Sequence, residues 1–158
     1  MGSSNGRTGC SELPNVSSSL TPKTMLFNYT FGEKLDLTRF QRQAAHYIAH
    51  MPEVSFHCDL PHYRVVVEVS GIENSSKHLA TIFISDIERD KDGEIVNENA
   101  VWPLLDTRFK ESKDIQAVFT AQDEWRGIFE SASANDTAEK ISRIVKHVHK
   151  IDHLKAFL

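Results

Sequence analysis

The chain has 158 residues, a formal net charge of -4 at pH 7, and contents of 40% hydrophobic and 25% charged residues. This length and composition are typical of one ordinary globular domain with a single core. A net negative charge argues against nucleic acid as a partner, and no apolar run reaches the roughly 20 residues that a membrane-spanning helix needs. We therefore expect neither a nucleic-acid nor a membrane partner.

The first 23 residues differ in composition from the rest of the chain. Residues 1–23 are rich in Ser, Gly and Asn and contain no aromatic side chain, which predicts a disordered leader before a single domain at 24–158. The start lacks the apolar region of a secretory signal. Cys10 lies in this leader and Cys58 in a predicted strand, so a reducing compartment is the simpler interpretation, and we expect a cytoplasmic protein.

The domain is expected to begin with a strand and a helix. Large apolar side chains alternate with smaller ones over residues 25–31, which predicts a half-buried strand. Over residues 37–51 the apolar spacing becomes helical, and Pro52 is expected to end the helix.

Four further strands are expected between residues 53 and 102. Alternation over 53–60 and 63–69 predicts two strands that each bury one face. Residues 79–87 are apolar on both faces, as is typical of a central strand, and 94–102 are expected to pair back with them. These strands would form an antiparallel meander.

The connection between the last two of these strands carries acidic residues at alternate positions, Glu88, Asp90 and Asp92, followed by Gly93. This spacing is partly that of a calcium-binding EF-hand loop, which also requires a bidentate Glu where Asn99 stands and an entering helix. An Asp-Gly pair between two apolar strands is a strong hairpin signal. We therefore predict a hairpin turn.

The last third of the chain is expected to be helical. Ser112 is predicted to cap a helix over 112–119, and residues 123–132 place Trp125 and Phe129 on one helical stripe. A final helix is expected from Asp136 to about Phe157, beginning with a capping-box-like pair of Asp136 and Glu139. Its predicted buried face comprises Ile141, Ile144, Val145, Val148 and Ile151.

Both tryptophans are expected to anchor the core. Trp102 precedes Pro103 where the sheet gives way to helices, and Trp125 lies on the apolar stripe described above. If either side chain were exposed, it would be the first place to look for an interface, because tryptophan is enriched at binding hot spots.

These elements predict an α+β fold with an N-terminal strand and helix, an antiparallel meander of about four strands, and a helical C-terminal third packed on one sheet face. The order of elements is similar to that of helix-grip ligand-binding domains and of ubiquitin-conjugating-like folds. This likeness concerns architecture alone and transfers no residue roles.

Two histidine pairs have the i,i+4 spacing of metal ligands on a helix: His46 with His50, and His149 with His153. Helical-wheel geometry places all four on solvated faces beside cationic side chains, which disfavour a bound cation. We expect no metal site and no cofactor, and these four histidines are the alternative candidates.

A catalytic site is not predicted either. His57 and Asp59 share one strand face and could form an oriented imidazole, whereas Cys58 points to the opposite face and is expected in the core. The chain lacks the Gly-x-Ser-x-Gly elbow, a phosphate loop and a dinucleotide fingerprint. His57 and Asp59 are the remaining catalytic candidates.

The leading functional hypothesis is a non-enzymatic binding or adaptor protein that engages a protein partner or a second copy through its C-terminal helix and acidic hairpin. The residues expected at this interface are Arg143, Lys146, His149, Lys150, His153, Asp90 and Asp92.

Two alternatives belong to other functional classes. The first is a small apolar-ligand carrier with a pocket between sheet and final helix. Its predicted lining comprises Val65, Val67, Phe83, Ile144 and Val148. The second is a metal- or His-dependent hydrolase that uses His57 and Asp59 or a histidine pair.

Overall fold

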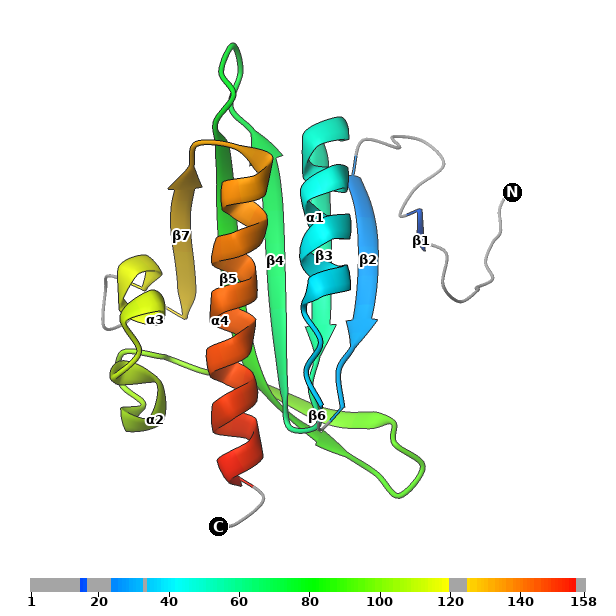
Figure 1. Cartoon of the computed structure of the whole chain (residues 1–158). Helices are drawn as coiled ribbons and strands as arrows, with labels where there is room; N and C mark the ends of the chain where they lie inside the picture. The colour runs from blue at the N-terminus through cyan, green and yellow to red at the C-terminus, as the bar shows by residue number, and fades with distance from the viewer. Residues whose placement is uncertain (1–14, 17–23, 33, 120–124, 156–158) are drawn as a thin grey trace.

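The computed structural model describes residues 15–16, 24–32, 34–119 and 125–155, and it has an α+β architecture (Figure 1). Asn15 and Val16, inside the predicted leader, form a short strand against the sheet. The rest of the predicted leader, including Cys10, lies outside the described residues.

The elements follow the predicted order over most of the chain. The N-terminal part comprises β1 (Asn15–Val16), β2 (Thr24–Thr30), α1 (Thr38–His50), β3 (Glu53–Asp59), β4 (Tyr63–Gly71), β5 (His78–Arg89) and β6 (Ile95–Ala100). The C-terminal part comprises α2 (Thr107–Lys110), α3 (Lys113–Val118), β7 (Arg126–Ser131) and α4 (Ala134–Lys155).

The strands form one mixed sheet in the order β1-β2-β3-β4-β5-β6, with β7 also paired to β5. The predicted antiparallel meander is confirmed for β3 to β6, whereas β2 lies parallel to β3 because α1 carries the chain back between them. β5 is the predicted central strand. It pairs with β4 along one side, and β7 and β6 share its other side.

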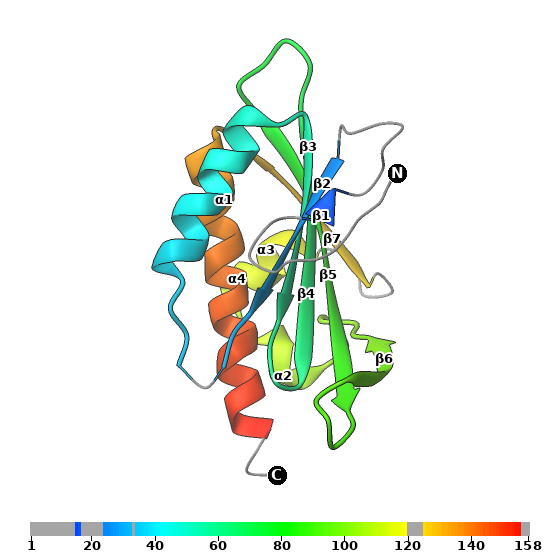
Figure 2. The same ribbon diagram turned by 90° about the vertical axis from the view of Figure 1, so that its right-hand side faces the viewer.

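One face of the sheet is covered by α1 and α4, which pack against each other (Figure 2). The inward faces of β3 and β4 are those predicted from alternation, and Phe40, Ala44 and Ile48 bury the facing stripe of α1. Because each fully buried large apolar side chain stabilises the fold by about 1.5 to 3 kcal/mol, this sheet–helix layer provides most of the driving force.

The predicted helix over residues 123–132 is wrong, since Arg126–Ser131 form strand β7 on the edge of β5. Their burial alternates with the period of two that a strand requires. Gly127 allows the close approach, because a Cβ there would lie 2.9 Å from Ile82 Cγ2 and 3.0 Å from Phe119 Cε2. For this segment, pairing with the free edge of β5 outweighs the helical spacing of its apolar residues.

The final helix starts two residues earlier than predicted, at Ala134. Ser133 Oγ accepts the Asp136 N–H, and Asp136 Oδ2 accepts the Ala132 N–H at 3.1 Å, so Ser133 takes the capping role predicted for Asp136. This backbone hydrogen bond lowers the pKa of Asp136. The predicted buried face is confirmed for Ile141, Ile144, Val145 and Val148, and Ile151 is half-buried.

Ser112 caps α3 as predicted, because its Oγ accepts the Ile115 N–H. The predicted hairpin turn is also confirmed. The Asp90 carboxylate accepts the N–H groups of Asp92 and Glu94, and Gly93 adopts a positive φ of 85° that favours glycine.

Candidate functional site

In the described part of the chain, no helix covers the second face of the sheet (Figure 2). We call this surface the open face. Its side chains come from alternate positions of β2, β3, β4, β5, β6 and β7, and the strand registers set them in rows. One row runs through Asn28, His57, Val66, Phe83 and Arg126.

Large apolar side chains gather on the β5 side of the open face. Trp125 packs against Phe83 with the two rings tilted by 35° and their centroids 4.9 Å apart, and Ile128 lies opposite Thr81 with Leu79 and Phe83 as its diagonal neighbours. We define the apolar strip as Val66, Leu79, Phe83, Trp125 and Ile128.

The apolar strip is substantially exposed. Leu79 is 39% exposed, Trp125 44% and Ile128 48%. The expectation that both tryptophans anchor the core is therefore wrong, since Trp102 is also 39% exposed. Trp125 lies in a bend just before β7, outside the alternation of the strand, and from there its ring packs against Phe83 on the open face.

The rest of the open face is polar and mostly acidic. The Arg64 guanidinium binds Asp59 through Nε and Nη2 at 2.6 and 3.1 Å and reaches Glu98 at 3.3 Å. The Asp59 carboxylate is thus bound by Arg64. This geometry does not favour Asp59 as the group that orients the His57 imidazole. Burial, and then the neighbouring Arg64 charge, lower the pKa of His57.

A hollow of about 300 Å³ opens beside the apolar strip. Two carboxylates, Glu53 and Glu68, reach it from β3 and β4, and the Thr24 hydroxyl donates a 2.6 Å hydrogen bond to Glu53. Among the described residues Glu68 has no hydrogen-bond or ion-pair partner. The other lining residues are Val54, Ser55, Val69, Ser70, Leu79 and Thr81.

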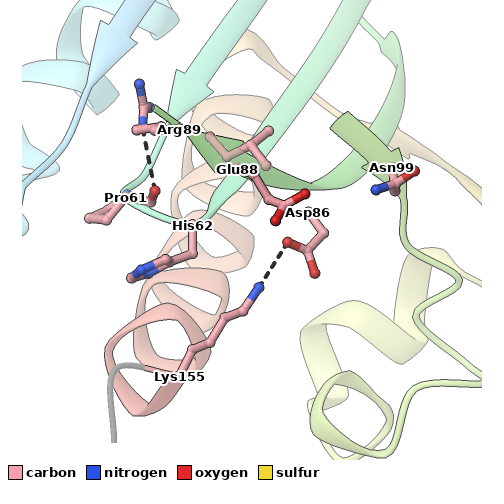
Figure 3. Close-up of a pocket in the computed structure, with 8 residues that line it drawn as sticks. Pro61, His62, Asp86, Glu88, Arg89, Asn99 and Lys155 are labelled. Atoms are coloured by element: carbon pink, nitrogen blue, oxygen red, sulfur yellow. Dashed lines mark hydrogen bonds and ion pairs between the residues drawn. The ribbon is translucent and has the colours of Figure 1, made fainter. Parts of the chain in front are cut away.

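A second pocket, of about 570 Å³, lies between the β5–β6 hairpin and the end of α4 (Figure 3). Lys155 of α4 reaches Asp86 of β5 at 2.8 Å and also lies 4.7 Å from the centre of the Tyr63 ring. On the opposite wall Arg89 donates to the carbonyls of Pro61 and Leu60, which ties the hairpin to the β3–β4 turn.

His62 lines the same pocket and is held by Asp152, which is buried. The Asp152 carboxylate accepts the His62 backbone N–H at 2.6 Å and the Nδ1–H at 3.0 Å. Because a carboxylate can only accept, these contacts set the imidazole tautomer with hydrogen on Nδ1. Sequence reasoning missed this pair, since 90 positions separate its members and no local pattern connects them.

The predicted interface on the C-terminal helix is only partly available. Arg143, Lys146, Lys150 and His153 are exposed on the outer side of α4. Arg143 is paired with Glu139. His149, expected to be solvated, is half-buried and donates to the Gly32 carbonyl at 3.0 Å.

In the acidic hairpin, the Asp90 carboxylate accepts hydrogen bonds from backbone N–H groups of the turn itself. Asp92 is exposed there. Residues of the hairpin strands and Lys155 at the end of α4 line the pocket of Figure 3 together.

Of the five residues predicted to line an apolar ligand pocket, four lie in the same core cluster and one lies on the opposite face of the sheet. Val65, Val67, Ile144 and Val148 are fully buried members of the core, whereas Phe83 lies on the open face. Cys58 is buried as predicted, and burial raises the pKa of its thiol.

The histidine pairs are placed on the helices as expected. The His46 and His50 rings are 4.5 Å apart on the exposed side of α1. His149 is turned toward Gly32, whereas His153 is exposed. Within the described ranges, no three His, Cys, Asp or Glu side chains are grouped so that they could hold a metal ion.

No protein-family model matches the chain, and no curated protein or solved structure is significantly similar to it. Among the described residues, every helix is too short or too polar to cross a membrane. Function is therefore inferred from the surfaces of this chain itself.

Proposed function

We propose that this protein is a non-enzymatic protein-binding module whose interface is the open face of its sheet. The observation that carries this proposal is the apolar strip, in which Trp125, Ile128 and Leu79 are exposed side by side beneath no covering element of the described chain. Contiguous exposed apolar side chains are rare on monomers unless they bind something, and tryptophan is the commonest hot-spot residue.

The charge of the open face indicates the chemistry of the partner. Five acidic side chains lie on the strands of this face against two basic ones, and Lys77, just before β5, pairs with one of the acids, Glu130, at 3.4 Å. The acidic side chains are Glu53, Asp59, Glu68, Glu98 and Glu130, and the basic ones are Arg64 and Arg126. A partner that presents cationic side chains beside apolar ones would complement both the strip and the carboxylates of the hollow.

The proposed interface differs in place from the one expected on the C-terminal helix and hairpin, because several of those side chains are used within the fold. The class of function stays the same. We also propose a cytoplasmic location, to which the free thiol of Cys58 in the described chain is suited.

A phage-displayed random peptide library panned against the full chain tests this proposal. We expect enriched peptides that combine Lys or Arg with apolar residues, and we expect Trp125→Ala to abolish their binding. Leu105→Ala is the matched control, since it removes a large apolar side chain that is even more exposed than Trp125, 61% against 44%, and lies outside the open face. Peptides that bind Trp125→Ala as well as the wild type would contradict the proposal.

A further inference from the structure

The helices that cover the sheet carry the opposite charge to the open face. α1 contains Arg39 and Arg42 and no acidic residue, and Lys146 and Lys150 project from the outer side of α4. All four side chains are exposed, and none has an ion-pair partner among the described residues. We call this surface the helix layer, and it lies on the side of the sheet opposite the open face (Figure 2).

The helix layer also fits the apolar strip. Arginine and lysine cover apolar surface with their methylene stems, and a guanidinium binds favourably over the face of a tryptophan. Arg42 and Arg39 are accompanied on α1 by small side chains, with Ala49 exposed and Ala45 half-buried. An arginine of a second molecule could therefore approach Trp125 closely, while a neighbouring cation enters the hollow between Glu53 and Glu68.

We propose that the occupant of the open face is the helix layer of a second copy of this chain. This inference rests on the proposed function and names its partner. Because the two surfaces lie on opposite sides of the molecule, the contact is heterologous, and copies associate head to tail into oligomers that can keep growing. Since the contact depends on exposed charges, it weakens as salt shortens the screening length.

Sedimentation velocity of the full chain over a range of concentrations tests this inference. At low ionic strength, about 20 mM, the average sedimentation coefficient should rise with concentration, and at about 500 mM the chain should sediment as a monomer. Reversing charges on the helix layer (Arg42→Glu with Lys146→Glu) or on the open face (Glu53→Lys with Glu68→Lys) should weaken self-association at least about tenfold in each case.

Mixing the two variants gives the sharpest result. Each variant alone faces like charges, whereas in the mixture the acidic helix layer of one meets the basic open face of the other, so association should return. This return also shows that both variants are folded. A variant with Lys110→Glu and Lys113→Glu, which alters the net charge by as much as the helix-layer variant at exposed positions on α2 and α3, should associate like the wild type.

Other outcomes overturn the inference. A wild-type chain that stays monomeric at low salt, or a mixture that stays monomeric, would refute the second copy as partner. If library peptides still bind around Trp125 in that case, the open face remains an interface for a different basic partner. If neither self-association nor peptide binding depends on the open face, both proposals fail.

Discussion

Replacing Gly127 by alanine distinguishes strand β7 from the helix that the sequence predicts there. In an exposed helix, glycine to alanine stabilises by about 1 kcal/mol, because alanine is the better helix former. In the structure, the added methyl would lie 2.9 Å from Ile82 Cγ2 and 3.0 Å from Phe119 Cε2 and Cζ. The two arrangements therefore predict effects of opposite sign.

The magnitude follows from the packing. Both neighbours are fully buried, so neither can move away without disturbing the core. Inserting a methyl group into such a site typically destabilises by about 1 to 3 kcal/mol. We expect the free energy of unfolding of Gly127→Ala to fall by about 2 kcal/mol, which lowers the urea midpoint at unchanged slope.

Gly71→Ala is the matched control, because no atom would lie within 4 Å of a Cβ there. This change should leave stability the same or raise it slightly through a less flexible unfolded chain. A Gly127→Ala protein as stable as the wild type, or more stable, would refute the packing of β7 against Ile82 and Phe119.

Three further predictions concern the fold around the site. Asp152→Ala should destabilise by about 3 kcal/mol in urea unfolding, because it leaves two His62 donors without an acceptor. His62→Ala should destabilise less, since the backbone N–H of residue 62 keeps its acceptor, and equal losses of stability would contradict this. Asp136→Ala should destabilise by about 0.5 to 1 kcal/mol near neutral pH. Because folding lowers the pKa of Asp136, its contribution to the free energy of unfolding is complete above the ordinary aspartate pKa of about 4. That contribution disappears as the pH falls through the pKa of Asp136 in the folded chain. A destabilisation by Asp136→Ala that persists at low pH would refute the assigned role. In a Cys10→Ser background, Cys58 should react with a thiol reagent only on unfolding, because the thiol is buried and its pKa is raised. Labelling of the native chain as fast as that of the unfolded chain would contradict the burial of Cys58.

Much of the fold could be predicted because its signals are local. Alternation over β3 and β4 and helical spacing over α1 and α4 identify buried faces without any knowledge of neighbours. The segment 126–131 could not be assigned in this way. Its apolar residues fit both periods, and the deciding factor, a free edge on β5, comes from residues more than 40 positions earlier.

The site was harder to predict than the fold. The sequence indicated that an exposed tryptophan would mark an interface, yet it could not tell that Trp125 would be exposed, because that depends on β7 joining the sheet. The charge contrast between helix layer and open face also arises only on folding, when α1 and α4, which carry Arg39 and Lys146, pack on one side of the sheet (Figure 2) and alternation along β3 and β4 turns Glu53 and Glu68 to the other.

The most direct test of the open face as an interface is the fluorescence of Trp125 in a Trp102→Phe variant, titrated with a library-selected peptide. We predict a saturable change in emission at the concentrations at which the peptide binds, because the exposed indole loses water on complex formation. Binding of the peptide with no change in Trp125 emission would place the interface elsewhere and contradict the account.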